Sequence, residues 1–182
     1  MIKKTTVLLS LLIVAAPVLA SDYSAGLKIS YFNPATQIFK NIYGNGAILG
    51  IKARKKGVFK NIGVILEAGY LKNQGKLTFS KEDTTVQIFF LGPGLIYQHT
   101  VGRFDLYGGA GLRYVHFKER NRIGNVTTGK MGTFISIGSY FQVTEKLVAD
   151  LSISFSGCQV KPADVKVEIG GLEIGVGIGY QF

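Results

Sequence analysis

Alternation of apolar residues with other residues is the feature that most constrains this chain. The pattern has a period of two and recurs in eight segments after residue 20, whereas no segment there keeps a 3.6-residue apolar period for long. Because successive side chains of a β-strand point to opposite faces, this pattern predicts an all-β protein. The eight segments are residues 25–32, 47–54, 62–71, 85–98, 104–114, 131–143, 147–155 and 172–182.

The two faces of these segments differ in composition. In six of them one face carries almost only Leu, Ile, Val, Ala and Tyr, while the other mixes Gly with polar residues and isolated charges; residues 85–98 and 131–143 carry aromatic residues on both faces, so their facing stays open. A closed barrel of eight strands has an interior that side chains just fill, which suits glycines and a few charges, and its aliphatic face suits lipid. The sequence therefore predicts an eight-stranded antiparallel up-and-down transmembrane β-barrel.

The expected connections alternate in length along the chain. Long connections are predicted at residues 33–45, 72–84, 119–130 and 157–170, and short ones at 55–61, 99–102 and 144–146. Transmembrane barrels have short periplasmic turns and longer outer loops. The alternation therefore favours such a barrel, with both chain ends on the periplasmic side.

The charged residues of the predicted inward face are balanced, with four cations and four anions. Buried charges are costly unless they are paired, so a neutral interior is physically sensible. Eight strands also leave a filled interior rather than a wide pore. We therefore expect an interior charge network formed by Lys28, Lys52, Arg54, Glu67, Asp105, Arg113, Asp150 and Glu173.

The first twenty residues have the features of a secretory signal peptide. Lys3 and Lys4 precede an apolar run over residues 7–16, and small residues at 18 and 20 predict cleavage before Ser21. A retained membrane helix is the alternative, but the run is only half as long as the roughly 20 residues that a spanning helix needs. We therefore predict a signal peptide at residues 1–20 and a barrel domain at residues 21–182. Export from the cytoplasm argues against a nucleic-acid partner.

The chain is basic, with 21 Lys and Arg against 11 Asp and Glu. Removal of Lys3 and Lys4 with the signal peptide leaves a net charge of +8. Three interpretations of the cations in the outer loops stay open: contact with lipopolysaccharide phosphates, at about 1 kcal/mol per charge, binding of anionic host or matrix polymers, and simple solvation. The outer-loop basic residues named for these contacts are Lys118, Arg120, Arg122 and Lys130. The last three lie within the predicted loop at residues 119–130.

Two segments carry a resemblance to a known family. Residues 170–182 end in Phe182, with Tyr180 and Ile178 at alternating apolar positions before it, and residues 102–114 form a glycine-rich hairpin. Both are similar to small bacterial outer-membrane β-barrels of the OmpA/OmpX type and to opacity-type surface proteins. The resemblance implies a Gram-negative outer membrane and a terminal strand, with Ile178, Tyr180 and Phe182, that the barrel-assembly machinery reads. It also implies a structural or surface-interaction role with an external ligand, or an opacity-type adhesin or immune-evasion protein.

An enzymatic role is the least favoured interpretation. Some small outer-membrane barrels modify lipid A, and the deacylase type uses a His and a Ser two residues apart. Here His99 and His116 lack such a serine, so we expect no catalytic activity. We also expect no cofactor and no metal, because a single cysteine excludes a multi-thiolate site. Cys158 lies in the last outer loop, as an unreactive thiol or as one that pairs between chains.

Overall fold

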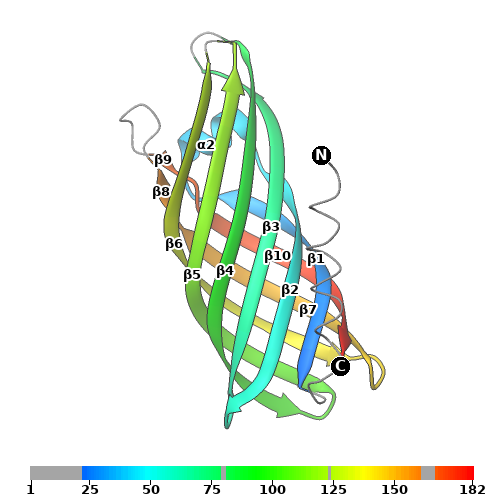
Figure 1. Cartoon of the computed structure of the whole chain (residues 1–182). Helices are drawn as coiled ribbons and strands as arrows, with labels where there is room; N and C mark the ends of the chain where they lie inside the picture. The colour runs from blue at the N-terminus through cyan, green and yellow to red at the C-terminus, as the bar shows by residue number, and fades with distance from the viewer. Residues whose placement is uncertain (1–21, 79–80, 123, 161–166) are drawn as a thin grey trace, which may run out of the picture.

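A computed structural model describes residues 22–78, 81–122, 124–160 and 167–182 (Figure 1). The signal peptide predicted for residues 1–20 lies outside them. One short helix and ten strands follow each other along the described chain. Their bounds are β1 (Tyr23–Pro34), α2 (Gln37–Tyr43), β2 (Gly46–Phe59), β3 (Ile62–Lys76), β4 (Asp83–Val101), β5 (Phe104–Asn121), β6 (Asn125–Gln142), β7 (Leu147–Gly157), β8 (Gln159–Val160), β9 (Val167–Glu168) and β10 (Gly171–Gln181).

Eight of the strands form one closed antiparallel barrel in the order β1-β2-β3-β4-β5-β6-β7-β10. The barrel closes where β10 pairs with β1, from Ser24 opposite Gln181 to Pro34 opposite Gly171. Closure gives each of these eight strands a partner on both sides, which removes exposed edges from the barrel and satisfies its backbone in lipid. The predicted eight-stranded barrel is thereby confirmed. Strands β8 and β9 form a separate two-stranded ribbon.

The aliphatic face of the strands is the outer surface of the barrel. Leu27 is 68% exposed, whereas its neighbour Lys28 is 9% exposed. The two segments of open facing follow the same rule: Phe90 and Phe134 are buried inside, while Leu95 and Ile135 face outward. Such an apolar exterior is typical of a barrel in a bilayer.

Tyr23, where β1 begins, and Phe182 lie together with the short turns at one end of the barrel. This short-turn end contains the connections at residues 60–61, 102–103 and 143–146. The opposite end, called the long-loop end, contains the described residues 35–45, 77–78, 81–82, 122, 124, 158–160 and 167–170, which connect the barrel strands there.

At the long-loop end, two of the predicted loops are wrong in extent. Residues 72–76 and 83–84 belong to β3 and β4, and most of 119–130 belongs to β5 and β6, so these four strands protrude beyond their neighbours (Figure 1). The pairing of Lys118 with Thr127 and of Glu119 with Val126 continues the hairpin after the lipid-facing apolar pattern has ended. Backbone hydrogen bonds and β-branched residues sustain such strands without lipid contact.

The helix α2 was not predicted and lies within the predicted loop at residues 33–45. It has seven residues, so its two buried positions, Phe39 and Tyr43, do not reveal a helical period in the sequence. A helix this short depends on packing rather than on intrinsic propensity. Among the described residues, no helix is both long and apolar enough to cross a bilayer.

Candidate functional site

The eight charged residues expected in the barrel interior all lie there and are at most 9% exposed. Each occupies an inward position of its strand, so the closed sheet directs the side chains toward one another. They form two groups of ion pairs rather than one. The larger group contains Lys28, Lys52, Glu67, Arg113, Asp150 and Glu173.

Glu67 lies at the centre of the larger group. Its carboxylate is 3.9 Å from Lys28 Nζ, 3.5 Å from Lys52 Nζ and 3.4 Å from Arg113 Nη2. Lys52 also pairs with Asp150 at 3.2 Å, and Arg113 also pairs with Glu173. Three cations thus meet three anions, so the group is neutral although it is almost completely removed from water.

The smaller group lies toward the short-turn end. Arg54 Nη1 is 3.3 Å from Asp105 Oδ2, and Thr100 donates a 2.7 Å hydrogen bond to the same carboxylate. Lys56 forms a further ion pair with Asp105. Lys56 was missed because its position falls in the predicted short turn at residues 55–61. Here a register irregularity lies between Lys55 and Phe59.

Two tyrosines complete the charged interior. Tyr107 accepts a 2.6 Å hydrogen bond from Lys52 Nζ, and its ring stacks on Tyr140 with centroids 4.8 Å apart. The guanidinium of Arg54 lies 3.7 Å from the centroid of the Tyr140 ring. Cation–π contacts of this kind strengthen when they are desolvated. Tyr140 lies in a segment whose facing the sequence left open, and therefore could not be assigned to the interior in advance.

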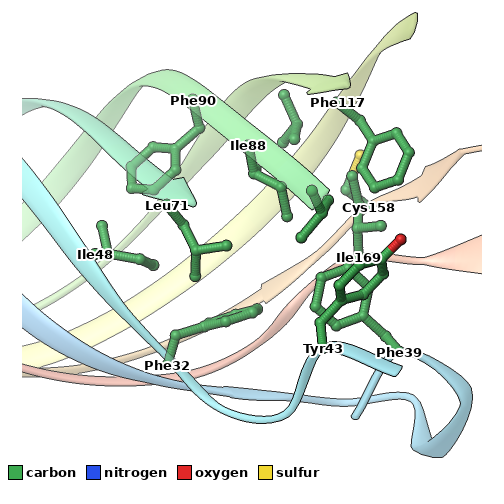
Figure 2. Close-up of a cluster of buried hydrophobic side chains, with 12 residues drawn as sticks. Phe32, Phe39, Tyr43, Ile48, Leu71, Ile88, Phe90, Phe117, Cys158 and Ile169 are labelled. Atoms are coloured by element: carbon green, nitrogen blue, oxygen red, sulfur yellow. The ribbon is translucent and has the colours of Figure 1, made fainter. Parts of the chain in front are cut away.

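An apolar cluster closes the interior at the long-loop end (Figure 2). Phe39 and Tyr43 of α2 pack there with inward residues of the barrel strands and with Ile169. Tyr43 forms a 3.2 Å hydrogen bond with Thr84, and Asn73 donates a 3.1 Å hydrogen bond to the Tyr43 carbonyl. Burial raises the pKa of the Tyr43 hydroxyl. These contacts fix the first long connection over the barrel mouth.

Cys158 lies at the start of the last long connection, where the sequence analysis placed it, and its side chain belongs to this apolar cluster. The thiol is free, and its residue is 5% exposed, just after the end of β7. Its Sγ lies 4.0 Å from the carbonyl oxygen of Lys130. Burial raises the pKa of the Cys158 thiol.

The four basic residues assigned to the outer loops do not form a loop cluster. Lys118 and Arg120 lie in β5 and Lys130 in β6, while Arg122 lies in the turn that follows β5. Lys118 and Arg120 share the outward face of β5 with exposed Tyr114, whereas Lys130 pairs with the buried Val115 and points to the opposite face.

An outward-facing basic row crosses the protruding strands. Lys72 pairs with Gln87, and Gln87 pairs with Lys118, so the three side chains lie side by side on one face. Tyr70, Phe89 and His116 form the adjacent row one pleat closer to the barrel centre. Cations next to aromatic residues are typical of a membrane–water boundary. We call Lys72, Gln87 and Lys118 the basic row.

The terminal strand presents Ile178, Tyr180 and Phe182 on the outer surface, where they are 58%, 42% and 45% exposed. Phe182 donates a 2.8 Å backbone hydrogen bond to Tyr23, which ties the last residue to the first strand. The three residues predicted as an assembly signal thus lie on one lipid-facing stripe.

Both histidines lie on the outer surface of the barrel wall. His116 pairs with Phe89 and Gly129 in the barrel wall, and His99 pairs with Leu106. In the part of the chain that the structure describes, no three His, Cys, Asp or Glu side chains gather as metal ligands.

Comparisons with known proteins place this geometry among bacterial barrels. OprG of Pseudomonas aeruginosa has a TM-score of 0.73 at 15% identity, covering 90% of this chain and 96% of its own. Neisserial surface protein A has a TM-score of 0.69 at 14% identity, covering 88% and 97%. Ail of Yersinia pestis, solved with the heparin analogue sucrose octasulfate, has a TM-score of 0.56 at 19% identity, covering 88% and 97%.

No curated protein matches the sequence. The family model described as the outer membrane protein beta-barrel domain matches residues 6–182. This match covers the whole described barrel, and the three solved structures share its fold. The chain therefore belongs to the outer membrane protein β-barrel domain family, and its location is the bacterial outer membrane.

Proposed function

We propose that the protein is a non-enzymatic surface barrel whose outward-facing cations bind the phosphate groups of lipopolysaccharide. Short turns of such barrels are periplasmic, so the long-loop end faces the outside of the cell. The observation that carries the proposal is the basic row, which lies about 7 Å, or one pleat, beyond the exposed aromatic residues Tyr70 and Phe89.

The charges of this surface suit a phosphorylated glycolipid. Lys72 is exposed, and Arg120 extends the outward basic face one pleat beyond Lys118. A cation near a charged membrane surface contributes about 1 kcal/mol, which corresponds to about fivefold in affinity. The interior anions pair with interior cations, so they do not compete with external anions for these surface cations.

Binding to immobilised lipopolysaccharide tests the proposal. We expect the refolded full chain to bind, and Lys118→Gln with Arg120→Gln to weaken binding by about 25-fold. Lys55→Gln with Lys60→Gln removes the same charge near the short-turn end and serves as the matched control. Equal losses in the two double variants would contradict the proposal, because they would show attraction to net charge alone.

A second candidate is an adhesin that binds sulfated or otherwise anionic host polymers, as the opacity-type alternative requires. The complex of Ail with a heparin analogue supports it, since that barrel shares this fold. It ranks second because Lys130 points to the opposite face from Arg120, so the cations of the β5–β6 hairpin do not form one surface. Retention on heparin at physiological salt, lost when Arg120, Arg122 and Lys130 are neutralised, would favour the adhesin.

We infer that the protein does not modify lipid A. His116 pairs with Phe89 and Gly129 across the strands, and neither of these residues carries a hydroxyl. The lipid A mass spectrum of an overexpressing strain should therefore match that of the parent strain. A new acylation or deacylation product would contradict this inference.

We also propose that Ile178, Tyr180 and Phe182 are read by the barrel-assembly machinery. Their shared outward stripe on the strand that closes the barrel supports this role. Removal of Phe182 should reduce the amount of folded barrel in the outer membrane, while refolding into detergent in vitro should change little. Equal losses in both settings would point to a purely structural role.

A further inference from the structure

A shallow apolar groove lies on the lipid-facing wall of β1 to β4. It holds about 540 Å³ of space, part of it open to the surroundings. Ala68 provides a small side chain at its floor, and Gly50 and Gly69 have none, while larger side chains stand around it. The larger residues are Leu27, Leu49, Ile51, Tyr70 and Phe89.

The depth of this groove matches the outer leaflet. Ala68 precedes Lys72 by four residues along β3, which is about 13 Å of strand and about 10 Å of depth for a strand tilted by about 40°. The hydrocarbon core of a bilayer is about 30 Å thick, so one leaflet extends about 15 Å from its boundary. A chain lying along β3 from Lys72 toward Ala68 therefore stays within one leaflet, with its head at the basic row.

Two cations lie above the groove, and they distinguish it from other parts of the barrel wall that contact lipid chains alone. Lys72 and Lys118 are separated by one intervening strand, which places their backbones about 10 Å apart. Gln87 lies between them and offers an amide donor on the same face. A lipid with one phosphate can pair with one of these two lysines, whereas a lipid with two phosphates can pair with both.

We propose that the groove binds one acyl chain of a bisphosphorylated, lipid A-type glycolipid, whose phosphates pair with Lys72 and Lys118. The inference rests on the proposed function and adds to it a defined site. The apolar floor takes the chain, and the basic row takes the head group. The protein thereby holds a particular glycolipid molecule against β1 to β4 instead of meeting lipopolysaccharide only through its outermost residues.

Native mass spectrometry of the refolded full chain in mild detergent tests this site. The probes are bisphosphorylated lipid A, the same lipid without its phosphates, and phosphatidylethanolamine. Ala68→Phe fills the groove and should weaken lipid A binding by about tenfold, a change that corresponds to exclusion of about two methylene groups. Ala110→Phe is the matched control, because Ala110 also faces lipid but lies on β5, outside the groove.

The head-group half of the site has its own variant. Lys72→Gln with Lys118→Gln should weaken lipid A binding by about 25-fold and leave binding of the dephosphorylated lipid unchanged. Heat-dependent gel mobility verifies that each variant is folded, and Ala68→Leu replaces Ala68→Phe if the larger side chain prevents folding.

The outcomes separate the two proposals. If the groove variants bind lipid A as the wild type does while the lysine variant loses binding, the acyl site is refuted and the proposed function stands. If the wild type does not bind lipid A at all, both proposals fail. Equal binding of phosphatidylethanolamine and lipid A would refute the preference for a bisphosphorylated lipid.

Discussion

Removal of the Glu67 carboxylate should expose how far the interior ion pairs stabilise the barrel. Glu67 is 4% exposed and pairs with Lys28, Lys52 and Arg113. In Glu67→Ala, Lys52 keeps Asp150 and Arg113 keeps Glu173. Lys28 forms its ion pair with Glu67, so this cation is left buried without that partner.

The size of the effect follows from this arrangement. Removing one member of a buried ion pair costs about 3–5 kcal/mol, because the other charge stays in a poorly solvated place. Two of the three cations keep an anion, so we expect about 3 kcal/mol, the lower end of that range. Removing both charges in Glu67→Ala with Lys28→Met should recover at least about half of the loss, since residues in one network are not additive.

Urea-induced unfolding in lipid vesicles measures these free energies. The chain has no tryptophan, so the folded fraction is best read from the mobility of unheated samples in gels. Glu145→Ala is the control, because Glu145 is exposed in a short turn and should change stability by less than about 0.5 kcal/mol. A free energy of unfolding for Glu67→Ala equal to that of the control would refute the reasoning.

Three further predictions concern the mouth and the wall of the barrel. Burial raises the pKa of the Cys158 thiol and so lowers its thiolate fraction at pH 8. Alkylation of Cys158 should therefore be at least about tenfold slower in folded than in urea-unfolded protein. Equal alkylation rates would contradict the burial of Cys158. Phe39→Ala should make the connection at residues 35–45 more sensitive to limited proteolysis, whereas exposed Ile38→Ala should not; equal cleavage would show that α2 is not held by its buried ring. Gly26→Ala should lower the free energy of unfolding by about 1–3 kcal/mol, because a Cβ there would lie 2.3 Å from the Ile178 carbonyl oxygen. Gly108→Ala is the control and should be well tolerated, because the nearest atom to a Cβ at that position is 3.9 Å away.

The strand faces could be predicted from the sequence because they depend only on alternation. Leu27 and Lys28 are adjacent, and they differ in residue type because one faces the lipid outside the wall and the other faces the charged interior. The helix α2 could not be predicted in the same way, because its contacts come from β3 and β4 through Asn73 and Thr84. The protruding strands were missed for a related reason, since backbone pairing continues where the lipid that imposes the apolar pattern has ended.

The membership of the interior network could be predicted, but its pairing could not. Lys52 and Glu67 are direct neighbours across β2 and β3, which the hairpin register implies. Arg113 and Glu173 lie on β5 and β10, which are not adjacent in the sheet, so they meet only across the closed interior. That contact depends on the shear of the barrel, which no local pattern encodes.

The division of charge between interior and surface predicts that substitutions of charged residues affect either stability or binding. The six-member interior group is neutral, so the surplus positive charge of the chain lies elsewhere. Substitutions of surface cations away from special contacts alter stability by less than about 0.5 kcal/mol. Lys72→Gln and Lys118→Gln should therefore change glycolipid binding while the urea midpoint stays at its wild-type value. Interior charges should thus stabilise the barrel, whereas exterior charges should bind ligand. Glu67→Ala should therefore lower the urea midpoint and leave glycolipid binding unchanged.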